Sequence, residues 1–187
     1  MDKKRLLHIG CGSQPIPDWL SHFDEVRVDI DPACKPHFVR NMLDLHDIGT
    51  FDFVFSSHCL EHLYPYQVTR ALAEFLRVLN PSGACLVVVP DLEDVKPDTN
   101  VIASTGVGPL CGLDMYYGLH TELEVNPHMA HHCGFVQSVL EMVFKAAGFE
   151  HVHVKRAGNY NLVGSGTAKT SEHWQALADE LCGIEAA

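Results

Sequence analysis

Leu6-Leu7-His8-Ile9-Gly10-Cys11-Gly12 is an apolar strand followed at once by a Gly-x-Gly turn. A second apolar stretch, Val26-Arg27-Val28, runs into the carboxylate of Asp29. Glycine lets the backbone approach a ligand with no Cβ in the way. A carboxylate at the end of the neighbouring strand can accept hydrogen bonds from two ribose hydroxyls. These two strand ends predict a nucleoside site at the carboxyl edge of a doubly wound sheet.

Strand-like and helix-like stretches alternate along the rest of the chain, a pattern typical of α/β folds with a mostly parallel sheet. We expect strands at 5–9, 25–30, 37–40, 51–56, 84–89, 151–156 and 160–164, and helices at 18–23, 65–79 and 135–147. Prolines such as Pro17 and Pro32 shorten the early helices, because proline cannot donate a backbone hydrogen bond. The turn Asn80-Pro81-Ser82-Gly83 should separate the long helix from the next strand.

The chain is predicted to be a single domain over residues 1–187, which is long enough to bury a core. Residues 92–132 show no regular periodicity, and so long an excursion in a compact domain is usually a lid or a binding loop. We call residues 92–132 the lid. Residues 171–187 should form a C-terminal surface helix and tail.

Composition limits the partners. The formal net charge is −11, from 24 acidic and 13 basic residues. Binding to a nucleic-acid backbone needs a basic face, so we expect none. No apolar stretch approaches the ~18 residues of a membrane helix, and the apolar stretch after the charged start is too short for a signal peptide. We therefore expect a cytoplasmic protein without a membrane partner.

Polar or acidic residues follow four successive predicted strands, whose carboxyl ends meet at one sheet edge. The carboxylate of Asp44 suits an exocyclic adenine amine, and Ile30 with Leu43 or Leu45 could sandwich the ring. The residues expected to contact the ligand are Gly10, Cys11, Gly12, Asp29, Ile30, Leu43, Asp44, Leu45, Ser56 and Ser57.

A dinucleotide fits this edge less well. The stretch Gly10–Pro15 lacks the third glycine of the G-x-G-x-x-G fingerprint. Pro15 and the broken first helix also make a poor platform for a pyrophosphate, which is normally held at a helix N-terminus. A ligand without phosphates is therefore favoured.

The ordered set of segments resembles the class I S-adenosylmethionine-dependent methyltransferases, particularly the small bacterial type. Residues 7–12 are similar to the first motif of that family, and residues 28–32 to the second. Further matches are Asp44-Leu45 with 51–54, the L-E-H segment at 60–63, the R-V-L-x-P-G-G-like turn at 77–83, and the closing segments 132–135 and 147–149.

The resemblance implies a seven-stranded sheet of order 3-2-1-4-5-7-6 with the last strand antiparallel. It also implies S-adenosylmethionine as the cofactor. Gly10 and Gly12 would lie near its methionine part, Asp29 on the ribose, and Asp44 on the adenine amine. The chain departs from the family at Gln14, which replaces the usual third glycine of the first motif.

Methyl transfer needs a base only where the nucleophile carries a proton, as an oxygen or nitrogen acceptor can. His58 and His62 flank the end of the fourth strand, and His131 lies in the lid, so these are the candidate catalytic bases. A bracing role for His62 is an equally open alternative. A denser set, His120, His128, His131 and His132 with Cys133, follows no known zinc spacing. We expect no metal.

The sequence thus predicts methyl transfer to a small-molecule acceptor. A non-catalytic S-adenosylmethionine-binding partner or sensor of the same fold stays open, because of the departure at Gln14. A nicotinamide oxidoreductase is least consistent, since the third glycine and a Tyr-x-x-x-Lys pair are both missing. A trimmed domain with an apolar lid also leaves homodimerisation open.

Overall fold

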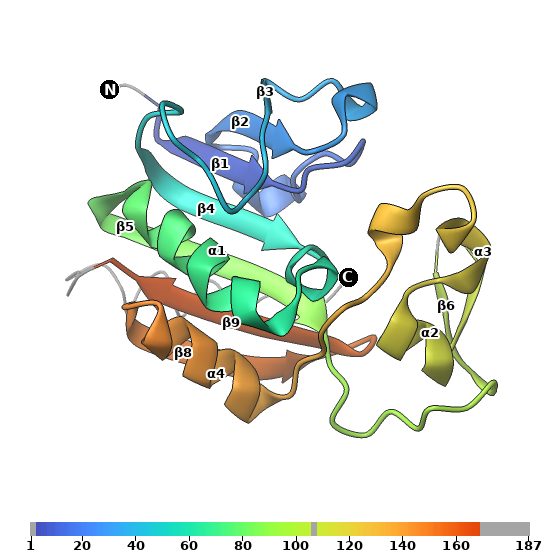
Figure 1. Ribbon diagram of the computed structural model, residues 1–187. Coiled ribbons are helices and arrows are strands. Elements are labelled where there is room, and N and C mark those ends of the chain that lie inside the picture. Colours follow the sequence, from blue (N-terminus) through green and yellow to red (C-terminus); the bar gives the residue numbers. More distant parts are fainter. Residues whose placement is uncertain (1–2, 106–107, 169–187) are drawn as a thin grey trace.

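The computed structural model describes residues 3–105 and 108–168. In this part of the chain a seven-stranded sheet has the order β3-β2-β1-β4-β5-β9-β8 (Figure 1). Its strands are β1 Arg5–Ile9, β2 Asp24–Asp29, β3 Phe38–Val39, β4 Phe51–Ser57, β5 Leu79–Pro90, β8 Glu150–Ala157 and β9 Asn161–Thr167. The first five pair in parallel, and β9 is antiparallel to both β5 and β8. The predicted order and the antiparallel last strand are confirmed.

The central strands are buried on both faces, as their continuous apolar sequences predict. In β4, Phe53 and Val54 point to opposite faces, yet each is at most 1% exposed. Val54 packs in the core beside Leu7 of β1 and Cys85 of β5. The carboxyl ends of β1, β2 and β4 therefore meet at one rigid edge of the sheet.

Two amphipathic helices cover the same face of the sheet, α1 (Pro65–Arg77) and α4 (Gln137–Ala146) (Figure 1). The buried side of α1 includes Val68, Leu72 and Phe75, at the spacing of one helix face. Proline is tolerated at the first position of α1, because that N–H has no intrahelical partner in any helix. Both helices were predicted, each somewhat longer than observed.

The opposite face is covered differently. The predicted helix over residues 18–23 is wrong in extent, since only the single 3-10 turn Asp18–Leu20 forms. Phe23 already precedes β2 and packs on Phe53 with stacked rings at 5.5 Å, while Trp19 meets Phe53 edge-on. The short connection and Pro17 leave too few residues for a helix.

The prediction that a turn at residues 80–83 separates the helix from the next strand is also wrong. The chain enters β5 at Leu79, which pairs with Phe51, and the register shifts before Phe53 pairs with Ala84. The side chain of Asn80 donates to Asp52 at 3.0 Å and holds this irregular stretch against β4. The turn sequence is accommodated as a bulge inside a longer strand.

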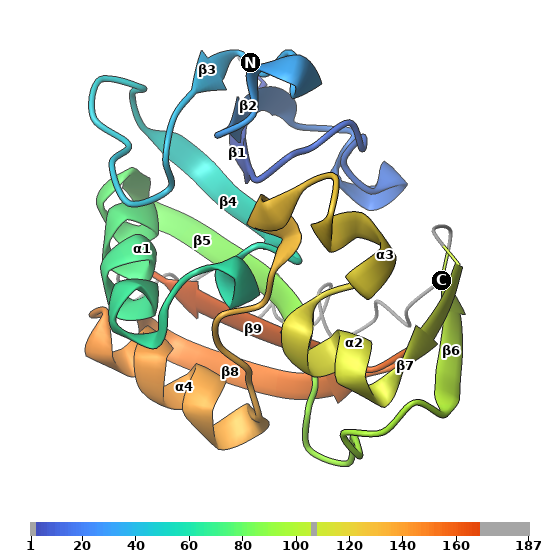
Figure 2. The ribbon, with the colours of Figure 1, turned by 45° about the vertical axis from the view of Figure 1, so that its right-hand side comes forward.

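The lid is more regular than predicted. It contains the antiparallel pair β6 (Val101–Thr105) and β7 (Gly108–Cys111), followed by α2 (Gly112–Tyr117), α3 (His120–Leu123) and the 3-10 turn Pro127–Met129. Figure 2 shows these elements beyond the carboxyl ends of β4 and β5. Each spans only three to six residues, too short to produce a clear periodicity in sequence.

Both ends of the lid are fastened to the sheet. At its start, the Leu92 N–H donates to the Phe135 carbonyl at 3.0 Å. Arg156 of β8 forms ion pairs with Asp91 and with Asp94. At its end, the His132 N–H donates to a backbone carbonyl of the segment after β4. The lid therefore leaves and rejoins the sheet at neighbouring points.

Within the described ranges, no helix combines the length and apolar character needed to cross a membrane. The predicted C-terminal helix and tail at residues 171–187 lie outside the described residues.

Candidate functional site

The turn after β1 requires glycine at Gly10. Its φ is +64°, in the left-handed region, and its N–H donates to the Val28 carbonyl at 2.9 Å. A Cβ on Gly10 would lie 1.7 Å from the sulfur of Cys59. The segment after β4 therefore packs directly on the turn, and only a residue without a side chain fits between them. Gly12 also has a positive φ, +49°, but a Cβ there would meet open space.

Asp29 joins the ends of the first two strands. The Gly12 N–H donates to its Oδ2 at 2.8 Å, and the Asp31 N–H donates to its Oδ1 at 2.9 Å. An ionised carboxylate can accept about four hydrogen bonds. Asp29 therefore holds the glycine turn and still has capacity to accept hydrogen bonds from a ligand.

Arg27 braces the same turn from β2. Its guanidinium donates to the carbonyls of Cys11, Gly12 and Gln14 at 3.3, 2.9 and 2.8 Å. It also pairs with Glu25 at 3.0 Å. Where a helix would normally follow such a turn, the fork of donors on one arginine satisfies the loop carbonyls. Sequence analysis did not single out Arg27, although a charge inside an apolar strand was a usable signal.

The residues expected around a flat ring occupy different environments. Ile30 is 52% exposed and Leu43 is partly buried, whereas Leu45 is fully buried in the core. Asp44 is exposed, and a hydrogen bond from His46 lowers the pKa of its carboxyl. Ile30, Leu43 and Asp44 can therefore face a ligand, while the side chain of Leu45 supports the core.

The end of β4 brings Ser56 and Ser57 to the same edge. Ser56 is buried and Ser57 is the last residue of the strand. The nearby thiols are unsuited to act as nucleophiles, because burial raises the pKa of Cys11 to about 11 and also raises that of Cys59. A protonated thiol is a weak nucleophile.

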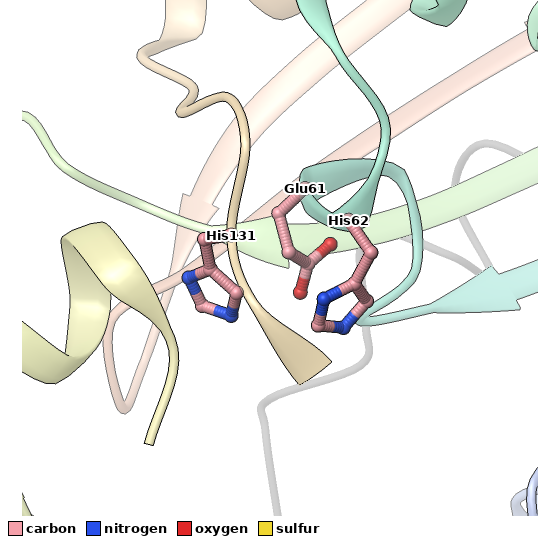
Figure 3. Close-up of side chains that lie close together, drawn as sticks. All are labelled: Glu61, His62 and His131. Carbon is pink, nitrogen blue, oxygen red and sulfur yellow. The ribbon is translucent and has the colours of Figure 1, made fainter. Parts of the chain in front are cut away.

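Three predicted histidines gather around a buried carboxylate that sequence analysis did not choose. Glu61 is 1% exposed, and His58 Nδ1 lies 3.4 Å from its Oε1. Figure 3 shows the Glu61 carboxylate beside the rings of His62 and His131. These two rings are 5.1 Å apart between centroids. We call Glu61, His58, His62 and His131 the Glu61 cluster.

Burial and neighbours set the charges in this cluster. Burial disfavours the charged form of Glu61, but the close approach and charge of His58 outweigh this effect and hold the pKa of the carboxyl below its ordinary value. Burial lowers the pKa of His131, so that this imidazole is neutral near pH 7. The cluster therefore presents a carboxylate beside a neutral imidazole.

The denser histidine set of the lid does not come together. His120 pairs with Asp114 at 2.7 Å, and His132 stacks on Tyr64 with centroids 4.4 Å apart. The Cys133 thiol donates to the Leu60 carbonyl, and His128 is exposed in the turn Pro127–Met129. His131 is the one member of this set that belongs to the Glu61 cluster.

The lid carries an open hollow of about 580 Å³ on its surface. Its lining includes Tyr117, Asp114 and His120. The neighbouring Tyr116 is a structural residue, because its hydroxyl donates to the Val95 carbonyl at 3.0 Å. Tyr117 is 63% exposed and so remains available to a ligand.

A family model described as a methyltransferase domain matches residues 1–154. The chain belongs to this family. The resemblance to class I S-adenosylmethionine-dependent methyltransferases drawn from the sequence is thereby confirmed. No curated protein matches this methyltransferase in sequence.

Solved structures share its fold. An S-adenosylmethionine-dependent methyltransferase from Mesorhizobium loti is 16% identical, with a TM-score of 0.61 over 88% of this chain and 91% of its own. The 1,6-didemethyltoxoflavin-N1-methyltransferase of Burkholderia thailandensis, solved with 1,6-didemethyltoxoflavin and S-adenosylhomocysteine, is 17% identical, with a TM-score of 0.60 over 89% and 72%. Human N-acetylserotonin methyltransferase, solved with S-adenosylmethionine, is 14% identical, with a TM-score of 0.61 over 89% and 48%. This chain thus spans about half of the human enzyme.

Proposed function

We propose that this methyltransferase transfers the methyl group of S-adenosylmethionine to an oxygen or nitrogen atom of a small molecule. The observation that carries the proposal is the 2.8 Å hydrogen bond between the Gly12 N–H and Asp29, at the edge where β1 and β2 end. It places an accessible backbone turn and a carboxylate side by side, which is what a nucleoside with a polar tail requires.

The residues at this edge fit the cofactor. The methionine part would lie against the turn Gly10–Gly12, where the space beside Gly12 is open, and the free lone pairs of Asp29 would accept hydrogen bonds from the ribose hydroxyls. Asp44 would accept the adenine amine, and Ile30 and Leu43 would flank the ring. S-adenosylmethionine supplies an already activated methyl group, so the protein contributes mainly alignment of the acceptor.

The acceptor is proposed to lie between the lid and the Glu61 cluster. The Burkholderia and human enzymes are named for small ring-containing molecules, which supports a small acceptor here. His58, His62 and His131 are the groups proposed to receive the acceptor proton, because the end of β4 and the lid bring all three to Glu61.

Calorimetry tests the cofactor first. Titration with S-adenosylmethionine and S-adenosylhomocysteine should show one binding site, and NADH should not bind. Release of S-adenosylhomocysteine with pools of phenols, alcohols, amines and ring nitrogens would then identify the acceptor class. Tight binding of S-adenosylmethionine without turnover on any pool would favour a non-catalytic binding protein of the same fold. If neither S-adenosylmethionine nor S-adenosylhomocysteine binds, the proposal is overturned.

A further inference from the structure

Glu61 is buried with both carboxylate oxygens lacking a hydrogen bond from any group in the described part of the chain. Its contact with His58 is an ion-pair distance of 3.4 Å to a half-exposed ring. Buried charges in proteins are normally both hydrogen-bonded and paired, or they coordinate a metal. The two open oxygens therefore indicate a missing partner.

The neighbouring imidazoles are held as metal ligands usually are. His62 Nδ1 lies 3.1 Å from the Ala130 carbonyl, and His131 Nδ1 lies 2.9 Å from the Met115 carbonyl. A carbonyl oxygen can only accept, so each Nδ1 carries a hydrogen, and Nε2 is the ring nitrogen left to bind a metal. Metal-bound histidines are typically oriented by this kind of hydrogen bond to a backbone carbonyl.

The three side chains are also close enough together. A carboxylate oxygen of Glu61 and one ring nitrogen each of His62 and His131 lie within 4.8 Å of one another (Figure 3). Ligands of one zinc ion at ~2.0–2.2 Å lie roughly 3.4 Å apart in a tetrahedron. A shift of about 1 Å in these side chains would bring the three ligand atoms to the separation that one zinc ion requires.

We propose that Glu61, His62 and His131 form a binding site for a divalent transition-metal ion, with Zn²⁺ as its best-suited occupant. Two imidazoles and one carboxylate are a ligand set of catalytic zinc sites, which leave a further position open. Magnesium is disfavoured, because it prefers oxygen ligands. This proposal departs from the expectation of no metal drawn from the sequence.

The open position gives the metal a role in the chemistry. This step rests on the proposed function. An acceptor hydroxyl bound there would lose its proton more readily, because a bound cation lowers the pKa of a coordinated oxygen. The alkoxide or phenolate formed would then attack the methyl carbon. With the metal bound, His62 and His131 would act as ligands, which leaves His58 of the three proposed bases to receive the acceptor proton.

Metal binding can be measured without cofactor or acceptor. Protein freed of metal with a chelator should bind one equivalent of Zn²⁺ by calorimetry, and Co²⁺ should give visible absorption bands typical of three or more protein ligands. Glu61→Gln and His131→Ala should each weaken Zn²⁺ binding about 100-fold. His22→Ala removes an exposed histidine elsewhere and should leave it unchanged.

The structural alternative is a simple ion pair between Glu61 and His58. It predicts no stoichiometric Zn²⁺ binding, or equal binding by the wild type and both site variants, and either result would overturn the proposal. Circular dichroism checks that each variant is folded, and the two site variants lie on different segments. A loss of Zn²⁺ affinity in a folded variant of either kind supports the site.

Cofactor affinity separates the two proposals. S-adenosylmethionine should bind the metal-free protein and Glu61→Gln equally well, because the residues proposed to hold the cofactor follow β1, β2 and β3, and Glu61 is not among them. Failure of cofactor binding with intact Zn²⁺ binding would reject the proposed function and retain the metal site. With an acceptor in hand, a chelator should abolish turnover, and Zn²⁺ but not Mg²⁺ should restore it.

Discussion

The backbone N–H of Gly12 donates a 2.8 Å hydrogen bond to Oδ2 of Asp29. This bond makes the turn after β1 and the end of β2 a single unit, which Arg27 then braces from the strand side. A ligand at this edge therefore meets a preformed surface and not a loop that must be ordered on binding. Preorganisation of this kind improves affinity by reducing the entropy lost on association.

Asp29→Ala should weaken S-adenosylmethionine binding tenfold to a hundredfold. The variant removes a charged acceptor worth ~1.5–3 kcal/mol to the ribose hydroxyls, and it also frees the Gly12 N–H. Asp24→Ala is a matched control, because Asp24 is exposed at the opposite end of β2. Calorimetry on the three proteins checks this, and unchanged affinity would remove Asp29 from the ribose role.

Arg27→Ala should weaken cofactor binding about tenfold while leaving the turnover of bound substrate nearly unchanged. The reason is that the turn carbonyls lose their donors, whereas the reacting atoms lie elsewhere. Arg27→Lys should recover little, since one ammonium cannot reproduce the planar fork. Steady-state kinetics should show a raised KM for the cofactor, and the exposed Arg70→Ala should not. A fall in kcat alone would contradict the bracing role.

Substitutions at the two turn glycines should lower the free energy of unfolding by different amounts. Gly12→Ala meets only backbone strain, about 1–2 kcal/mol, because a Cβ there is unobstructed. Gly10→Ala adds overlap with Cys59, about 1–3 kcal/mol more. Chemical denaturation should give the larger loss for Gly10→Ala. Adding Cys59→Ala to Gly10→Ala should restore part of the lost free energy of unfolding. If none is restored, the overlap with Cys59 is not the cause of the loss.

Acid should loosen the lid through Asp114. Burial alone would raise the pKa of this carboxyl, but hydrogen bonds from Cys111 and His120 outweigh it and hold the pKa well below its ordinary value. A lowered folded-state pKa means that the stabilisation is complete above about pH 4. It is lost as the pH falls through the folded value.

Asp114→Asn should therefore destabilise the protein by about 1–2 kcal/mol at pH 7. The difference in stability between the wild type and Asp114→Asn should decrease progressively below about pH 4. Thermal unfolding of both proteins across this range measures the difference. A difference that does not vary with pH would show that the charge of Asp114 is not what stabilises the lid.

The strands of the sheet could be predicted because their signals are local, whereas the order of the strands came from the resemblance to a known family. Each buried strand is a continuous apolar stretch, and Gly10 and Asp29 mark two strand ends within single motifs. The bulge at residues 80–83 could not be predicted, since it depends on the pairing of Asn80 with a strand almost thirty residues earlier. The short strands β6 and β7 of the lid could not be predicted for the same reason, because strands of this length are recognised only by their pairing.

Glu61 illustrates what sequence leaves out of a site. In sequence it is a charged residue between a strand and a helix, where solvent exposure is the ordinary expectation. Its burial arises because the end of the lid rests on it, with the N–H groups of His132 and Cys133 donating to its carbonyl. That contact spans some seventy residues. The spacing of His58, Glu61 and His62 was the local signal available.

The lid meets the sheet through two adjacent ends, joined by the hydrogen bond from Leu92 to Phe135. An excursion whose ends already touch can change in length or sequence without altering the spacing of β4, β5 and β9. The sheet edge proposed to hold the cofactor and the lid proposed to select the acceptor can therefore diverge independently. Exchanging residues 93–130 between relatives is accordingly a direct route to new acceptors, provided that His131 is kept together with the hydrogen bonds from the His132 and Cys133 N–H groups to the Glu61 carbonyl.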